Sequence, residues 1–179
     1  CASGGEQRDT IGKLINQAVE DGAQIISISQ SIHTSDELKW AVTNATAHGV
    51  IIVASSGNKS IDDNSKHLGQ YSGVVGVSAI DTTGNFASYS SWGNGVVTAA
   101  VGGPFDSFNP NTNAPGRSDG TSNSAAMVAG MLALARQKWP EATTNQILQL
   151  LVHTGQNPNH DWNQYTGYGP IDIHAMINT

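Results

Sequence analysis

The apolar run at residues 50–54, Val-Ile-Ile-Val-Ala, is the sequence feature that most constrains the fold of this chain. Apolar and polar residues do not alternate in it, which is typical of a strand buried on both faces. Residues 38–45, before this run, have the apolar spacing of a helix, and residues 24–29, before that helix, form a short β-rich run. A strand, a helix and a strand joined by short links predict a right-handed crossover in a parallel sheet. We therefore predict an α/β fold with a mainly parallel central sheet.

The rest of the chain continues this alternation of helices and strands. Apolar residues recur every three or four positions in further segments, which predicts helices over residues 11–19, 122–135, 143–151 and 173–177. Short β-rich runs predict strands over residues 74–80, 86–90 and 96–100. Capping-box spacings mark two helix starts, at Thr34 with Glu37 and at Thr143 with Gln146. Residues 102–119 are rich in Gly, Pro and Asn, and we expect a surface loop there.

Length and charge narrow the kinds of partner. At 179 residues the chain is long enough for one domain with a real core, or for a large part of one. The net charge of −6 argues against nucleic acid or an anionic membrane as the main partner. We expect neither a membrane-spanning segment nor a signal peptide in it, because no apolar run approaches the required length. Cys1 is the single cysteine, which excludes an internal disulfide bond.

A candidate nucleophile is the first residue of the helix expected at residues 122–135. Gly120 and Thr121 lead into Ser122, so the serine is placed at the helix N-terminus. Free backbone N–H groups and the positive end of the helix dipole favour negative charge there. The oxyanion that forms during acyl transfer needs such an environment. The alternative interpretation is that Ser122 only caps the helix, as serine often does.

A second candidate side chain follows the buried strand. Asn58 comes after residues 54–57, just beyond the carboxyl end of that strand, where catalytic groups of open α/β sheets collect. Its amide is able to donate a hydrogen bond to a developing oxyanion, and the N–H of Ser122 offers a second donor. Asn after Gly is also a common turn residue. The presence of both candidates in matching contexts favours catalysis.

Several segments together resemble the C-terminal part of the catalytic domain of subtilisin-like serine proteases, the subtilases. Residues 54–58 are similar to the oxyanion-asparagine segment of the family, and residues 120–122 resemble its nucleophile motif. Residues 87–93 and 167–172 are similar to two further family segments, in the family's order. The run over residues 120–128 looks most like that of the mycosins, which are subtilases tied to actinobacterial type VII secretion.

The resemblance implies a subtilisin-like three-layer fold and the activity of a serine endopeptidase. Ser122 is implied as the nucleophile, and Asn58 together with the backbone N–H of Ser122 as the oxyanion donors. The segments that carry the Asp and His of a subtilase triad precede the region that matches from Ile11 onward. We therefore expect residues 1–179 to be the C-terminal portion of one catalytic domain, with the triad Asp and His on an N-terminal segment outside this chain.

The resemblance also implies substrate contacts. Residues 29–31 are expected to pair with extended substrate backbone as an added strand, and residues 55–57 to line the pocket for the residue before the cut. The full expected set is Ser29, Gln30, Ser31, Ser55, Ser56, Gly57 and Thr121. Departures from the family pattern fall at Ala126 and Met127, at Tyr71-Ser72 and at Val101. They bear on the shape of the subsites more than on the reaction.

The expected partners are a polypeptide substrate and the N-terminal fragment of the same protease. By resemblance we expect a secreted or cell-surface protein, with any membrane contact made through a segment outside this chain. No cofactor is expected. Many subtilases bind calcium, but Asp62, Asp63 and Asp81 show no ligand spacing that assigns a metal site, and a solvated loop is the favoured interpretation.

Alternative interpretations stay open at this stage. Residues 1–9 are polar and Gly-rich, as expected of a flexible surface loop cut by proteolysis, and the chain would then be the larger product of that cut. A truncated fragment is the second interpretation. An inactive subtilase-like module that binds extended peptides is the third, although binding alone requires neither Ser122 nor Asn58.

Overall fold

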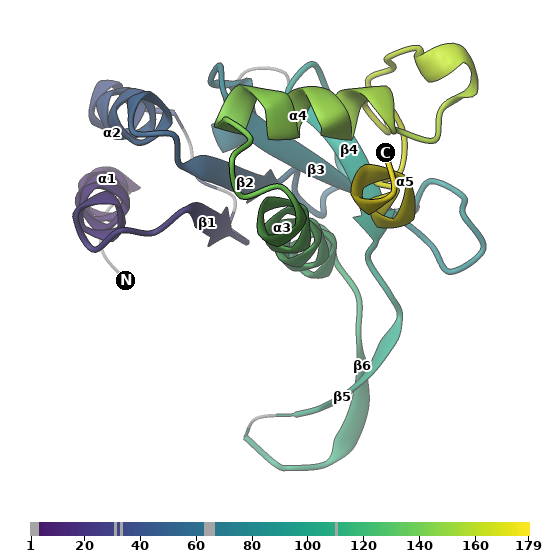
Figure 1. Cartoon of the computed structure of the whole chain (residues 1–179). Coiled ribbons are helices and arrows are strands. Elements are labelled where there is room, and N and C mark those ends of the chain that lie inside the picture. Colours follow the sequence, from purple (N-terminus) through teal and green to yellow (C-terminus); the bar gives the residue numbers. More distant parts are fainter. Residues whose placement is uncertain (1–3, 31, 33, 63–66, 110) are drawn as a thin grey trace.

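The computed structural model describes residues 4–30, 32, 34–62, 67–109 and 111–179, with side chains from Thr10 onward. A parallel sheet of four strands lies at its centre, in the order β1-β2-β3-β4 (Figure 1). These strands are β1 (Ile25–Ile28), β2 (Ile51–Ser55), β3 (Val74–Ile80) and β4 (Val96–Val101). The helices are α1 (Gly4–Glu20), α2 (Asp36–Ala47), α3 (Thr121–Lys138), α4 (Thr144–His153) and α5 (Ile173–Ile177). The fold is the α/β class that the strand and helix pattern predicts.

The two faces of the sheet carry separate cores, which explains why β2 shows no alternation. Ile51 and Val53 point into a core shared with α3, α4 and α5, here called the α3-side core. Ile52 and Ala54 point to the other face, into a core shared with α1 and α2, here called the α2-side core. Every residue of β2 is buried. Each face of this strand therefore contributes to hydrophobic stabilisation.

Two predicted boundaries are corrected by the structure. Helix α1 begins at Gly4, so the part of the expected loop at residues 1–9 that the structure describes is helical backbone. Apolar periodicity detects only the packed turns of a helix, and its earlier turns are polar. Helix α2 is capped by Ser35, whose Oγ accepts from the N–H of Leu38, and not by the predicted box at Thr34 and Glu37.

The predicted strand over residues 86–90 is also wrong. Phe86 makes a single antiparallel bridge to Ile80, and the chain then turns. The N–H of Ala79 donates to the hydroxyl of Ser90 at 3.0 Å, so a side chain replaces the ladder contact that a strand would make.

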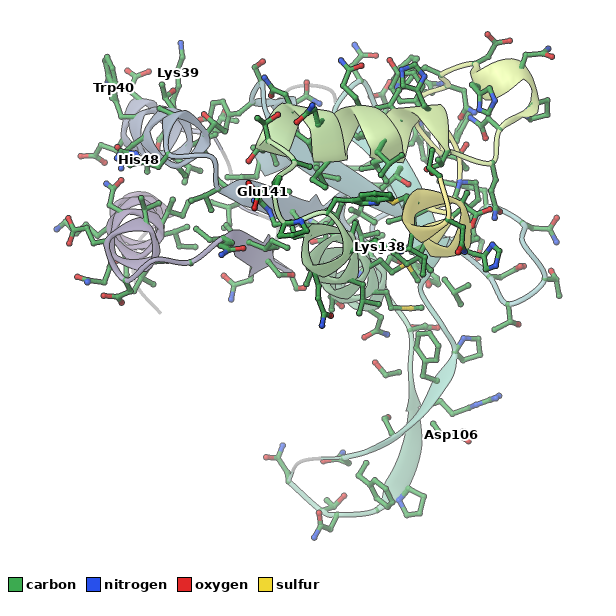
Figure 2. All side chains as sticks on the ribbon, viewed as in Figure 1. Lys39, Trp40, His48, Asp106, Lys138 and Glu141 are labelled. Carbon is green, nitrogen blue, oxygen red and sulfur yellow. The ribbon has the colours of Figure 1, made fainter. Side chains whose placement is uncertain are left out.

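The expected surface loop at residues 102–119 contains a hairpin. Its strands are β5 (Phe105–Phe108) and β6 (Pro115–Ser118), and the hairpin extends away from the rest of the chain (Figure 1). Its side chains are largely exposed, including Phe108 at 69% and the surface pair of Arg117 with Asp106. Figure 2 labels Asp106 on the hairpin. Few contacts in the described part of the chain therefore hold the hairpin in place.

Strand β1 forms one edge of the sheet. Ile25 to Ile28 pair with β2 on one side, and no described residue pairs with them on the other. The residues of β1 are half-buried or exposed, whereas β2 and β3 are fully buried. The apolar residues of β1 are therefore less covered than an interior strand of such a sheet would be.

We predict that Gly130→Ala stabilises the chain. Gly130 is exposed in the interior of α3, and a Cβ atom placed on it meets nothing within 4 Å. Alanine in a helix interior should raise the free energy of unfolding by about 0.5–1 kcal/mol, measured by denaturant titration.

Gly76→Ala is the contrasting variant. A Cβ atom there would lie 1.9 Å from the carbonyl oxygen of Gly95, so this variant should fail to reach the native structure. A loss of stability in Gly130→Ala would show that the face of α3 at this position is covered.

Candidate active site

Ser122 lies in the first turn of α3, after a turn that only glycine makes easily. The N-cap residue Gly120 has φ 150° and ψ 156°, a conformation that side chains rarely adopt. Its N–H donates to the carbonyl of Gly102 at 2.9 Å, which ties the turn to the end of β4. The N–H of Ser122 is among the first four of the helix, which have no intrahelical acceptor. The sequence-based placement of Ser122 at a helix N-terminus is confirmed.

Asn58 lies in the loop after β2 and its carboxamide meets the start of α3. Its Oδ1 accepts from the backbone N–H and from the hydroxyl of Thr121, both at 2.8 Å. Because a backbone N–H only donates, this contact assigns the oxygen of the carboxamide to Thr121. The Nδ2 group then points the other way as a donor.

The Nδ2 group of Asn58 and the hydroxyl of Ser122 converge on one point. A Cβ atom placed on Gly120 would lie 3.1 Å from each of these two atoms. Both therefore border the Cα of Gly120 on the same side, and any side chain at this position would strike them. Two turns that are 64 positions apart in the sequence thus bring a hydroxyl and an amide donor together.

Thr121 links the two turns through its side chain. Its buried hydroxyl accepts from the N–H of Gly57 at 3.2 Å and donates to Oδ1 of Asn58. The sequence grouped Thr121 with the substrate contacts, and the structure in addition gives it a direct contact with the carboxamide. The residue types in the motif carry no signal for that contact, because it joins two separate loops.

The remaining predicted site residues lie either at the end of β1 or at the end of β2. The hydroxyl of Ser29 donates to the carbonyl of Ser122 at 3.1 Å, so the end of β1 contacts the turn at residues 120–122, here called the serine turn. Gln30 is exposed beside the open edge of β1, and Ser31 lies outside the described residues. Ser55 and Ser56 are buried, and the hydroxyl of Ser56 donates to the carbonyl of Ser91, so it is not available to a ligand.

Two residues that the sequence did not single out support the serine turn. Nδ2 of Asn123 donates to the carbonyl of Gly102 and to the hydroxyl of Ser118 at the base of the hairpin. Tyr89 packs against Gly102, where an added Cβ would lie 2.4 Å from its hydroxyl. Burial raises the pKa of Tyr89, so the phenol stays neutral at physiological pH.

The described histidines belong to other elements. His48 ends α2 and His67 precedes the short 3₁₀ helix at Leu68–Gln70. His153, His160 and His174 lie in the C-terminal part of the chain. The elements that carry Ser122 and Asn58 contain no histidine, and the chain supplies no general base from them.

The described residues show neither a cluster of metal ligands nor a membrane-spanning helix. Among them, no group of three or more His, Cys, Asp or Glu side chains lies close enough to hold a metal ion, and Asp63 falls outside them. The carboxylate of Asp81 accepts from the hydroxyl of Thr83 and from backbone N–H groups, which lowers its pKa. No described helix combines the length and the apolar character needed to cross a bilayer.

The match to a family profile defines the class of protein. The family profile of the Subtilase family, Peptidase_S8, matches residues 1–169, and the chain belongs to this family. Its relatives include subtilisin DY from Bacillus licheniformis, 32% identical over 178 residues that cover 97% of this chain and 64% of that protein. Fervidolysin from Fervidobacterium pennivorans is 31% identical over 94% of this chain and 27% of its own length.

Solved structures agree with the mycosin-like features of the sequence. The crystal structure of MycP1 from Mycobacterium smegmatis superposes with a TM-score of 0.84 at 26% identity, over 96% of this chain and 55% of that one. A structure of MycP1 from the ESX-1 type VII secretion system gives the same TM-score and identity. The chain therefore spans about half to two thirds of subtilisin DY and of these mycosin structures, and a smaller share of fervidolysin.

We predict that Thr121→Val destabilises the chain although valine has nearly the same shape. The buried N–H of Gly57 loses its acceptor, and Oδ1 of Asn58 loses one of its two donors. The free energy of unfolding should fall by about 1–3 kcal/mol. Thr121→Ser keeps the hydroxyl and is the matched control, with a smaller loss. Equal stability of Thr121→Val and the unchanged chain would contradict the assigned bonds.

Proposed function

We propose that this chain is the nucleophile-bearing part of a serine endopeptidase, completed by an N-terminal segment that carries the triad Asp and His. The observation that supports this most is the convergence of the Ser122 hydroxyl and the Asn58 Nδ2 group on one point. Family membership supports peptide-bond chemistry in general. The natural setting is proposed to be outside the cytoplasm, as a secreted or surface-attached protease.

The reaction is proposed to be acyl transfer through a covalent intermediate. The Ser122 oxygen attacks the peptide carbonyl carbon while the histidine of the other segment takes the hydroxyl proton. The carbonyl oxygen becomes an oxyanion, which accepts from Asn58 Nδ2 and from the N–H of Ser122. The C–N bond then breaks as the histidine returns the proton to the amine. Water hydrolyses the acyl-serine by the same steps in reverse.

The second segment is required on energetic grounds. A serine hydroxyl is a weak nucleophile at neutral pH unless a base activates it. In subtilisin, a relative, loss of the histidine or the serine lowers kcat by about 10⁶-fold. Without a base from outside, this chain is therefore proposed to be nearly inert.

The open edge of β1 supports the docking of such a segment. An apolar groove runs along this edge, lined by residues of α1 and β1 that include Ile11, Leu14 and Ile26. Leu14 is 61% exposed and lines this groove, so the groove presents a large apolar side chain to whatever docks there. A strand added to this edge would pair the free backbone groups of β1 and cover the groove at the same time.

Substrate is proposed to bind as an extended strand along residues 29–31, with its scissile carbonyl beside Ser122. The hydrogen bond from Ser29 to the carbonyl of Ser122 supports this, because it brings the start of that segment to the serine turn. The pocket for the residue before the cut is proposed to be formed by Ser55, Ser56 and Gly57, with Ser56 contributing backbone. Thr121 is proposed to contribute by orienting Asn58.

We predict that Asn58→Ala, in the enzyme assembled with its N-terminal segment, lowers kcat by about 10²–10³-fold with little change in KM. That range is the one known for the corresponding donor of subtilisin. Asn58→Asp is the informative companion, because it keeps an oxygen for Thr121 but offers no N–H. Both variants should lose a similar factor in steady-state kinetics. Unchanged kcat in either variant would remove Asn58 from the oxyanion site.

We predict that a fluorophosphonate modifies Ser122 only when the N-terminal segment is bound. Mass mapping of the adduct identifies the modified residue, and Ser122→Ala is the control that should not react. The chain alone should react slowly or not at all, because no base activates the hydroxyl. Lack of an adduct in the assembled protein would favour a peptide-binding module over a protease.

A further inference from the structure

The segment between β1 and α2 is held at both of its ends. At the first end, Ser29 donates to the carbonyl of Ser122. At the second end, the hydroxyl of Tyr71 accepts from the N–H of Ser35 at 2.9 Å and donates to the carbonyl of the same residue at 2.8 Å. Between them Ile32 is buried, at 4% exposure, in the α2-side core. One phenol thus satisfies both backbone groups of the residue that ends the segment.

Tyr71 itself has a rigid setting. It follows the 3₁₀ helix at Leu68–Gln70, where its N–H donates to the carbonyl of Leu68. Its own carbonyl accepts from Val74, the first residue of β3. The ring packs against the α2-side core. Burial raises the pKa of Tyr71, so its hydroxyl keeps the proton that it donates to Ser35 at neutral pH.

The two ends of this segment would meet different parts of a bound peptide. The contact at Ser29 lies at the serine turn, whereas the contact at Ser35 lies at the N-cap of α2, six positions further along the chain. A peptide paired with this segment would place its residues nearest the scissile bond at the Ser29 end. Its more distant residues on the acyl side would lie toward the end that Tyr71 holds.

We infer that Tyr71 is a positioning residue whose hydroxyl holds the far end of the segment that begins with the substrate-pairing residues 29–31, and so sets the affinity for extended peptides. This inference rests on the proposed function. It assigns Tyr71 no contact with substrate. The chemistry at Ser122 is independent of the hydroxyl, because the Ser29 contact remains when the phenol is removed.

The test compares two substrates in the enzyme assembled with its N-terminal segment. One is a tetrapeptide amide, and the other carries the same leaving group on a single acylated residue. Tyr71→Phe removes both hydrogen bonds to Ser35, and the KM for the tetrapeptide should rise about 3–10-fold. The kcat for both substrates and the KM for the short substrate should stay within about twofold.

Tyr165→Phe is the matched control. The ring of Tyr165 packs against Phe86 and Trp92, is 43% exposed, and its hydroxyl makes no hydrogen bond to any described residue. This variant should leave both substrates unchanged. The melting temperature of each variant is measured alongside, so that a loss of folded enzyme is not read as a change in KM.

Three outcomes would overturn the inference. If Tyr71→Phe lowers the melting temperature but leaves the KM for the tetrapeptide unchanged, the hydroxyl is only structural. If both substrates lose kcat equally, the hydroxyl acts on the serine turn instead. If the unchanged assembled enzyme hydrolyses neither substrate, the proposed function fails and this inference fails with it.

Discussion

The contact between the Asn58 carboxamide and Thr121 is the interaction on which the rest of the site depends. It joins the loop after β2 to the first turn of α3, and it uses the oxygen of the carboxamide, so that the nitrogen lies beside Gly120, as the Ser122 hydroxyl does. The same threonine hydroxyl satisfies the N–H of Gly57. Donors held in this way need no reorganisation when charge develops, and preorganisation of this kind is the main source of electrostatic catalysis.

The burial of the sheet is uneven, and its least covered part, among the described residues, is the edge at β1. Strands β2 and β3 are buried throughout, but β1 has one free edge and half-exposed isoleucines. The same edge leads into the segment that we propose to pair with substrate. The segment that we propose to dock on β1 would cover this edge beside the turn that carries Ser122, so its binding would affect both stability and the proposed activity.

Much of the fold follows from local patterns. The helix at Ile173–Ile177, the capping box of Thr143 with Gln146 and the strand at Val74–Ile80 all lie where apolar spacing and capping chemistry place them. The errors lie where tertiary contacts compete with local preference. Ser35 caps α2 in place of Thr34 while the Tyr71 hydroxyl binds its backbone, and Ser90 replaces a strand contact with a side-chain bond.

By itself, the sequence determined the fold class, the membership of the family and the two candidate residues Ser122 and Asn58, because each depends on residue types at short spacing. Only the tertiary structure decided that the amide nitrogen of Asn58 and the hydroxyl of Ser122 lie together beside Gly120, and that Thr121 and Ser29 contact these two residues. The reason is physical: hydrogen bonds between loops that are distant in the chain depend on how helices and strands pack, and no local spacing encodes them.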